Sequence, residues 1–266
     1  MTEVFDDIRF LARAEPRIRA IRLLAKRPCS RDELIDVLDI SRATLSRLLR
    51  QFEDRGWVEQ DGQQYTTTRF GTAIADDISS LTETVTTTQE VQPLDEYLPF
   101  DELGLEIHQI RGATITKATS SDPSAPARQV GQILESSNRT RILKHAIDPN
   151  ASRPHYEAVI EGQQRTEVVL TRDAIRTVTQ NSETRQWFEE MVTNDVPLYR
   201  YDGSLPVNLK IVDDTVLLTP SDENGLIVAL VECENEDILS WATDLFESYC
   251  SQATRVGMDA FVPETG

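Results

Sequence analysis

Residues 33–59 read ELIDVLDISRATLSRLLRQFEDRGWVE and predict two amphipathic helices joined by a tight corner. Ser30 and Glu33 form a capping box that begins the first helix, because each can satisfy a backbone N–H of the other. The corner is residues 39–41, and Ser41 is the N-cap of the second helix, expected from residue 42 to about 55. The apolar residues are Leu34, Val37 and Leu38 in the first helix, and Leu45, Leu48, Leu49 and Phe52 at core spacing in the second.

The flanking sequence adds helices and a hairpin to this pair. Two helices are predicted over 4–14 and 16–26, and Pro16 suits the first turn of the second. After Gly56, two short strand-like runs flank Asp61-Gly62, a dipeptide that favours a β-hairpin. A further helix is expected over 68–84, and the Thr/Gln-rich stretch that runs to Pro93 indicates a domain boundary.

The charge of the chain is strongly negative and unevenly distributed. The 266 residues carry a formal net charge of −18, with 27 Lys and Arg, of which only 4 are Lys. Such an acidic, lysine-poor composition resembles that of proteins from extremely halophilic cells; the alternative is an ordinary acidic protein with a biased genome. Residues 1–70 are nearly neutral, with 13 Lys and Arg against 12 Asp and Glu. A segment that meets phosphates would have to avoid the acidity of the rest.

Several classes of protein are excluded by what the sequence lacks. Its 3 Cys have no paired spacing and its 3 His are scattered, so we expect neither a disulfide framework nor a metal site. No cofactor motif is present. No run of 18 apolar residues and no signal peptide are visible, so we expect a cytoplasmic protein without membrane contact.

The order helix, corner, helix, Gly, aromatic, hairpin, helix over residues 16–85 resembles the winged helix-turn-helix of bacterial and archaeal regulators. One departure is Asp39 in the corner, where glycine is common; Asp tolerates the left-handed conformation. The resemblance implies that the second helix enters the major groove of double-stranded DNA and that the hairpin follows the backbone. The alternatives are a solvated amphipathic helix and a winged helix recruited for protein contacts. The predicted DNA-binding residues are Arg31, Ser41, Arg42, Ala43, Thr44, Ser46, Arg47, Arg50, Gly62, Gln63, Gln64 and Arg69.

Beyond about residue 91, strand-like runs alternate with helical stretches, a pattern that predicts an α/β domain. The expected strands are 141–147, 167–170, 198–201, 208–212, 216–218 and 226–233. The expected helices are 155–163, 172–180, 184–193 and 237–251.

Four segments of this second domain carry a further resemblance: RILKHAI at 141–147, YEAVIEG at 156–162, TEVVLT at 166–171 and LYRYDGSLPV at 198–207. They resemble the effector domain of archaeal regulators related to methanogenesis regulators, which is similar to phospholipase D.

Phospholipase D chemistry needs H-x-K-x-x-x-x-D twice, with histidines as nucleophile and acid. The nearest match has Asn208, Lys210 and Thr215 at the three positions, and no second copy exists. We therefore expect no catalysis.

We expect a binding or dimerising role for this region instead, and the candidate ligand-binding residues are His145, Asn208 and Lys210. Lys210 could bind an anion, although a lysine on a strand is more often a surface residue that snorkels. His145 and His155 flank an Asp148-Pro149 turn near the carboxyl end of a strand, where α/β ligands bind, or are simply two partly exposed histidines.

The sequence thus predicts an α+β N-terminal winged helix-turn-helix domain over 1–90, followed by an α/β effector domain over 91–266. We expect an archaeal transcriptional regulator that binds operator DNA as a homodimer, with a small-molecule effector as a further possible partner. The helices over 4–14 and 68–84 are the expected dimer elements. The alternatives are a phosphodiesterase-like enzyme with a DNA-binding anchor and a protein-interaction adaptor.

Overall fold

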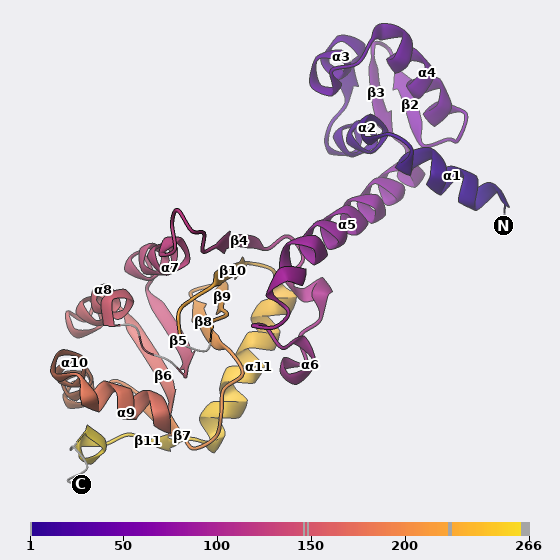
Figure 1. Cartoon of the computed structure of the whole chain (residues 1–266). Helices are drawn as coiled ribbons and strands as arrows, with labels where there is room; N and C mark the ends of the chain where they lie inside the picture. The colour runs from indigo at the N-terminus through magenta and orange to yellow at the C-terminus, as the bar shows by residue number, and fades with distance from the viewer. Residues whose placement is uncertain (1, 146, 148, 223–224, 262–266) are drawn as a thin grey trace. The chain divides into compact units, whose positions relative to one another are not determined.

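The computed structural model describes residues 2–145, 147, 149–222 and 225–261. The chain divides into two compact units, Met1–Val85 and Thr86–Gly266, which are described separately below as the N-terminal and C-terminal units (Figure 1). Together they make a mixed α and β protein. No helix of the described residues is both long and apolar enough to cross a membrane.

The N-terminal unit is built from helices around a small antiparallel sheet with strand order β1-β3-β2. Its core is a single cluster of buried apolar side chains that includes Leu45, Leu48, Leu49 and Phe52, as predicted. Its elements are α1 (Thr2–Ala12), α2 (Glu15–Lys26), β1 (Cys29–Ser30), α3 (Arg31–Leu38), α4 (Arg42–Glu53), β2 (Val58–Asp61), β3 (Gln64–Thr67) and the first part of α5 (Arg69–Val91), whose residues from Thr86 on belong to the C-terminal unit.

Local signals in the sequence fix the helix starts and the corner of this unit. The capping box of Ser30 and Glu33 is formed, and the Ser41 side chain accepts a hydrogen bond from the Thr44 N–H. Asp39 takes the left-handed conformation that the corner requires, with φ 52°. Val37 differs from its apolar neighbours because it is 45% exposed, so only Leu34 and Leu38 of α3 enter the core.

The hairpin and the last helix differ from the prediction in detail. Asp61 pairs with Gln64, so the two-residue loop is Gly62-Gln63, one position later than the predicted turn, and Gly62 has φ 59°. β1 was not predicted; it pairs with β3 through two residues.

Helix α5 ends at Val91, seven residues beyond the predicted end, so the Thr/Gln-rich stretch before Pro93 is largely helical. Its hydroxyls bond carbonyls one turn back, as Thr82 does to Ile78 O at 2.7 Å, and therefore do not interrupt the helix.

The C-terminal unit contains an eight-stranded sheet with order β11-β7-β6-β5-β8-β9-β10-β4. Only β5, β6 and β7 run parallel; the remaining pairs are antiparallel, so the predicted α/β pattern holds for this part alone. The first elements are η1 (Gln92–Leu94), α6 (Phe100–Leu103), η2 (Ile107–Ile110), β4 (Thr114–Lys117), α7 (Ala125–Glu135), β5 (Arg139–Lys144) and α8 (Pro149–Ile160). The others are β6 (Arg165–Thr171), α9 (Arg172–Gln180), α10 (Ser182–Thr193), β7 (Leu198–Tyr201), β8 (Asn208–Val212), β9 (Thr215–Thr219), β10 (Ala229–Cys233), α11 (Glu236–Gln252), β11 (Thr254–Arg255) and η3 (Met258–Phe261).

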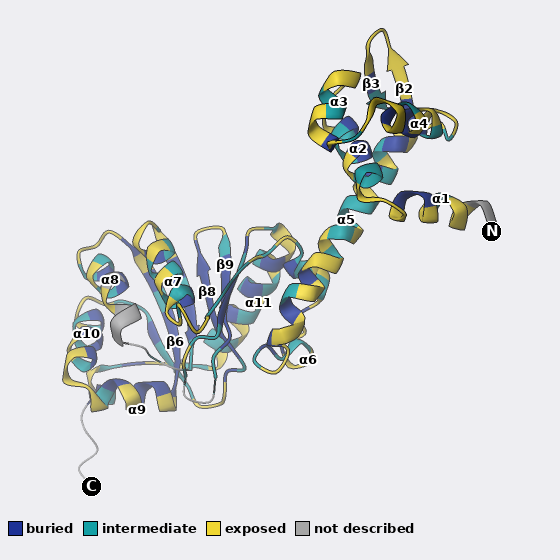
Figure 2. Cartoon of the chain, turned by 45° about the horizontal axis from the view of Figure 1, so that its top comes forward, coloured by how far each residue is buried: buried dark blue, intermediate teal, exposed yellow. Residues whose placement is uncertain are grey.

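Helices cover both faces of this sheet, as the buried strands in Figure 2 show. Helix α11 packs on one face through Ile238, Ala242 and Phe246. Helices α8, α9 and α10 pack on the other face against β5 and β6, and α7 covers β8–β10 on that same face. Helix α8 begins at Pro149, six residues before the predicted start, while β5 ends at Lys144. Residues 146 and 148 of the predicted strand end and turn lie outside the described residues.

Glycine is required at position 71, where α5 passes directly over the start of the hairpin. A Cβ on Gly71 would overlap the carbonyl oxygen of Trp57. The same carbonyl accepts a 3.0 Å hydrogen bond from Thr68 N, so a shift of this carbonyl away from the methyl group would strain that bond.

We expect Gly71→Ala to lower the free energy of unfolding by about 3 kcal/mol, because an inserted methyl group in a packed contact forces the backbone apart. Gly131→Ala in α7 is the matched control: its Cβ would meet no heavy atom within 4 Å, and the helix should gain about 0.5–1 kcal/mol. Chemical denaturation followed by circular dichroism measures both. Equal stabilities of the two variants would contradict the close approach.

Candidate functional site

The outward face of α4 is exposed and rich in arginine. Arg42, Ala43, Thr44, Arg47 and Arg50 are exposed on it, opposite the leucines that enter the core. At its start the hydroxyl oxygens of Ser41 and Thr44 lie 3.0 Å apart, so both are held at the first turn. The helix therefore presents short hydroxyls at its N-terminus and guanidinium groups one to two turns further on.

Arg31 ties α3, α4 and the hairpin together. Its guanidinium donates to the Tyr65 hydroxyl at 2.8 Å and to the Ser46 hydroxyl at 3.3 Å. Tyr65 is almost fully buried, and its own hydroxyl donates to Gln60 Oε1 at 2.9 Å. Arg31 thus positions α4 relative to the hairpin. Sequence reasoning missed Tyr65, since an aromatic residue in a short strand gives no sign of this bond.

Three of the predicted arginines, Arg47, Arg50 and Arg69, form no ion pair with any described residue. The guanidinium of Arg69 stacks over the Phe70 ring at 4.7 Å. Arg42 lies 3.6 Å from Asp32, but both side chains are more than four-fifths exposed, so the pair is worth little. These charges remain free for an external anion.

The hairpin tip offers neutral groups. Gly62, Gln63 and Gln64 are exposed, as predicted for a wing, but the exposed carboxylates of Glu59 and Asp61 lie on the adjoining strand β2. Any contact of the tip with a phosphate therefore has to come from amide groups.

In the C-terminal unit, the structure brings His145 and Asn208 together at the carboxyl end of β5. The His145 N–H donates to Asn208 Oδ1 at 2.8 Å, and the His145 ring nitrogen Nδ1 lies 3.2 Å from Leu205 O. Burial, followed by the charge of Lys210, lowers the pKa of His145. Thr215 pairs with Val212 whereas Asn208 pairs with Thr219, so the last position of the degenerate motif lies at the opposite end of the β8–β9 hairpin.

Lys210 is buried inside the sheet, contrary to the expectation of a snorkelling surface side chain. It is 5% exposed, and its Nζ lies 3.2 Å from Thr219 Oγ1. Burial, and then the charge of Lys144, lowers its pKa to about 7.

His155 is also buried rather than partly exposed, and its Nε2 lies 3.2 Å from Thr140 Oγ1. Burial, followed by the charges of Lys144 and Lys210, lowers its pKa to about 3, so it is neutral.

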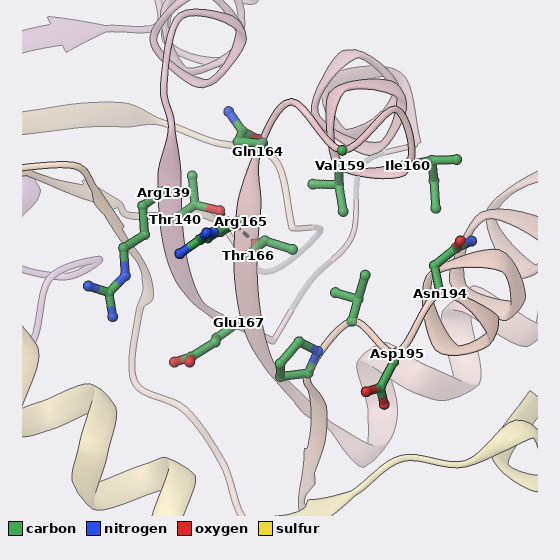
Figure 3. Close-up of a pocket in the computed structure, with 13 residues that line it drawn as sticks. Arg139, Thr140, Val159, Ile160, Gln164, Arg165, Thr166, Glu167, Asn194 and Asp195 are labelled. Atoms are coloured by element: carbon green, nitrogen blue, oxygen red, sulfur yellow. Dashed lines mark hydrogen bonds between the residues drawn. The ribbon is translucent and has the colours of Figure 1, made fainter.

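A pocket of about 700 Å³ lies at the opposite, amino end of the parallel strands, where the sequence predicted no site (Figure 3). We call it the amino-edge pocket. It is lined by residues 139–140 of β5, residues 159, 160 and 162 at the end of α8, residues 164–167 of β6 and its approach, and residues 194–197 before β7. The described residues hold no cluster of three or more His, Cys, Asp or Glu that could bind a metal ion.

Two family models match the chain. Residues 5–90 match the model described as the HVO_A0261 N-terminal domain. Residues 123–252 match the middle domain of the methanogenesis regulatory protein FilR1. Over these residues the C-terminal unit is therefore similar to a domain of a regulatory protein. No curated protein matches the chain.

Among solved structures, TrmBL2, an archaeal chromatin protein described with a novel mode of DNA binding, covers 91% of this chain and 94% of its own, at 15% identity and a TM-score of 0.42. Nuc, a phospholipase D family member from Salmonella typhimurium, covers 55% of this chain and 99% of its own, at 13% identity and a TM-score of 0.43. NucT from Helicobacter pylori covers 54% of this chain and 98% of its own, at 9% identity and a TM-score of 0.42. Likeness at these scores assigns neither a fold nor an activity to this chain.

Removal of the buried charge by Lys210→Met should change how stability depends on pH. The pKa of Lys210 in the folded state, about 7, lies below the ordinary value of 10.5. A charged Lys210 therefore destabilises the folded state, and this cost in free energy is fully present below pH 7. Between pH 7 and about 10.5 the unfolded chain binds more protons, and wild type gains about 1.4 kcal/mol per pH unit relative to the variant.

Urea unfolding of both proteins between pH 6 and pH 10 measures this difference. Lys117→Met, which removes a lysine from the half-buried edge strand β4, is the control and should show no such slope. A pH-independent difference for Lys210→Met would show that Lys210 is solvated.

Proposed function

We propose that the chain is a sequence-specific DNA-binding transcriptional regulator whose N-terminal unit is a winged helix-turn-helix. The observation that carries the proposal is the outward face of α4, where Arg47 and Arg50 lie unpaired behind the hydroxyls of the first turn. Arginine forks onto guanine edges and phosphates, and a helix of this kind fits the major groove. The match of residues 123–252 to a domain of a regulatory protein supports the same class.

Within this proposal, base reading and backbone contact fall to different residues. Thr44 and Arg47 lie within the first two turns of α4 and face the base edges. Arg50 and Arg69, with the neutral tip of the hairpin, face phosphates. Arg31 contributes by holding α4 against Tyr65 rather than by touching DNA.

Salt affects these contacts unequally. In molar salt the Debye length is about 3 Å, so distant attraction to phosphates is lost and short direct contacts must carry the binding. The near balance of 13 basic and 12 acidic residues over 1–70 is consistent with such a mode.

Arg47→Ala should therefore reduce discrimination between operator and random DNA by about 1–3 kcal/mol, the value of a bidentate base contact. Arg69→Ala should weaken binding to both sequences alike and flatten the salt dependence. Titrations on operator and scrambled duplexes across salt separate the two effects. Arg176→Ala, which removes one exposed arginine from α9, controls for net charge. An operator preference that survives Arg47→Ala would refute the assignment of α4 as the reading helix.

We further propose that the regulator is a homodimer held by α1 and α5. Apolar side chains stay exposed on both helices: Leu81 and Val85, one turn apart on α5, are 57% and 47% exposed, and Val4, Phe5 and Ile8 project from α1. A second copy would remove these groups from water, and a two-fold dimer matches the symmetry of operators.

Leu81→Glu with Val85→Glu should turn the dimer into a monomer, since each buried carboxylate would be desolvated without a partner. Ala73→Glu with Thr86→Glu adds the same charge at other exposed positions of α5 and should leave the dimer intact. Light scattering after size-exclusion chromatography measures the molar mass of each protein in solution. A wild-type monomer, or a dimer unaffected by the first pair, would refute the interface.

For the C-terminal unit we propose ligand binding rather than catalysis. Asn208 cannot act as a nucleophile or accept a proton, and its amide is bonded to His145 N–H. Phosphodiester turnover that disappears in Lys210→Met would instead establish the enzyme. The ligand-binding role of His145, Asn208 and Lys210 stays a prediction.

A further inference from the structure

The ring of Phe10 joins α1, α2 and the end of α4 in the N-terminal unit. It is 8% exposed and lies nearly perpendicular to the ring of Phe52 in the core, with the ring centroids 5.8 Å apart. The guanidinium carbons of Arg17 and Arg55 lie over the Phe10 ring, at 4.2 Å and 4.0 Å from its centroid. Because a guanidinium group is attracted to the face of an aromatic ring, Phe10 holds two arginines from distant parts of the sequence close together.

The charges of these two arginines are balanced differently. Arg55 Nε lies 2.8 Å from a carboxylate oxygen of Asp7, which neutralises its charge. Arg17 donates from Nη1 to the backbone carbonyl of Phe10 and forms no ion pair with any residue that the structure describes. Arg13, in the turn between α1 and α2, is exposed and likewise has no ion-pair partner in that part of the chain. We call Arg13 and Arg17 the basic corner.

The basic corner is continuous with the arginine face of α4. Burial, followed by the charges of Arg13, Arg47 and Arg55, lowers the pKa of Arg17, so all three guanidinium groups are near enough to act on it. Gln51 follows Arg47 by about one helical turn, and its carbonyl accepts a hydrogen bond from Arg55 at 3.0 Å. This side of α4 therefore faces α1 and the start of α2.

The acidic residues near the basic corner do not neutralise it. Asp7 is engaged by the arginine that follows α4, and Glu15, in the first turn of α2, lies 3.9 Å from Arg19. The exposed carboxylates of Glu53 and Asp54 lie at the C-terminal end of α4. A reading helix contacts base edges through its N-terminal residues, so its C-terminal end lies farther from the groove.

The basic corner and the hairpin lie on different sides of α4. The side chain of Ser46 faces the hairpin, because its hydroxyl accepts from Arg31, which also holds Tyr65 of β3. Arg47 is the next residue, and successive residues of an α-helix are about 100° apart around its axis. A helix in the major groove has a sugar-phosphate backbone on each side of it. If the hairpin follows one backbone, the basic corner lies beside the other.

We propose that the basic corner binds phosphates of the DNA backbone on the side of the major groove away from the hairpin. This rests on the proposed function, because it takes α4 as the reading helix. Arg13 binds a phosphate with an exposed guanidinium group. Arg17 uses Nη1 to bind Phe10 and keeps Nη2 for the phosphate, where the hydrogen bond is charge-assisted. The contact with Phe10 positions Arg17, so α1 contributes to DNA binding without touching DNA itself.

Fluorescence anisotropy of the full-length protein with a labelled DNA duplex of mixed sequence tests this contact, since phosphate contacts carry no sequence information. The titration is repeated over a series of salt concentrations. Arg13→Gln/Arg17→Gln should weaken binding by about tenfold or more at low salt, because hydrogen bonds to charged groups are strong. The slope of log affinity against log salt should fall in magnitude by about 2 for each protomer bound.

Arg172→Gln/Arg176→Gln is the matched control, because it removes the same charge from exposed positions of α9. It should bind with the affinity and the salt slope of wild type. Circular dichroism checks that each variant is folded, since Arg17 packs on Phe10. Should the first double variant not fold, Arg13→Gln alone must still lower the magnitude of the salt slope by about 1.

The possible failures of the two proposals are distinguishable. If wild type binds the duplex and the Arg13 and Arg17 variant binds it with an unchanged salt slope, the basic corner is refuted and the regulator is not. Equal losses in both double variants would also refute the basic corner, because they would show an effect of net charge alone. Failure of the wild type to bind any DNA duplex refutes the proposed function, and the basic corner with it.

Discussion

The C-terminal unit depends on one constraint: helices pack on both faces of the central strands. With α11 on one face and α7–α10 on the other, β5, β6 and β8 must bury both sets of alternating side chains. Such strands are normally apolar throughout. The polar residues that interrupt them, Thr140, Thr166, Asn208 and Lys210, therefore need partners inside the protein, and each has a hydrogen bond there.

Those partners are distributed from the amino ends of the central strands to the carboxyl end of β5. At the amino edge the threonine pair reaches the neutral ring of His155. Burial, together with the charges of Lys144 and Lys210 further along the same face, keeps that ring from taking up a proton. The carboxyl end then closes through the bond between His145 and Asn208. Polar groups thus follow one another across the face that α7–α10 cover. Apolar side chains would be buried there at a lower cost in free energy.

Sequence patterns predicted the features of this fold that are local. The capping box at Ser30 and the leucine stripe of α4 depend only on residues three or four apart. The predicted end of α5 was wrong because threonine is on average unfavourable in a helix interior, whereas here the hydroxyls of Thr82 and Thr84 bond carbonyls of the preceding turn. Strand β1 has two residues and carries no period at all.

The two candidate sites differ in the same way, since one depends on local sequence and the other on long-range pairing. The exposed face of α4 follows from helix geometry, so its arginines could be named from the sequence. The amino-edge pocket arises from an offset between β6 and β7, and its arginines are brought together by parallel pairing across 26 positions of sequence. No property of either segment alone indicates that offset, and the burial of Lys210 likewise depends on helices distant in the chain.

The choice of arginine over lysine also limits how the α4 face could be controlled. Lys26 is the only lysine in residues 1–70, and the other three, Lys117, Lys144 and Lys210, lie on strands of the C-terminal sheet. A guanidinium keeps its proton at any pH a cell reaches, and acetylation acts on amines, not on guanidinium groups. Neither proton loss nor acetylation can therefore remove the positive charge of that face.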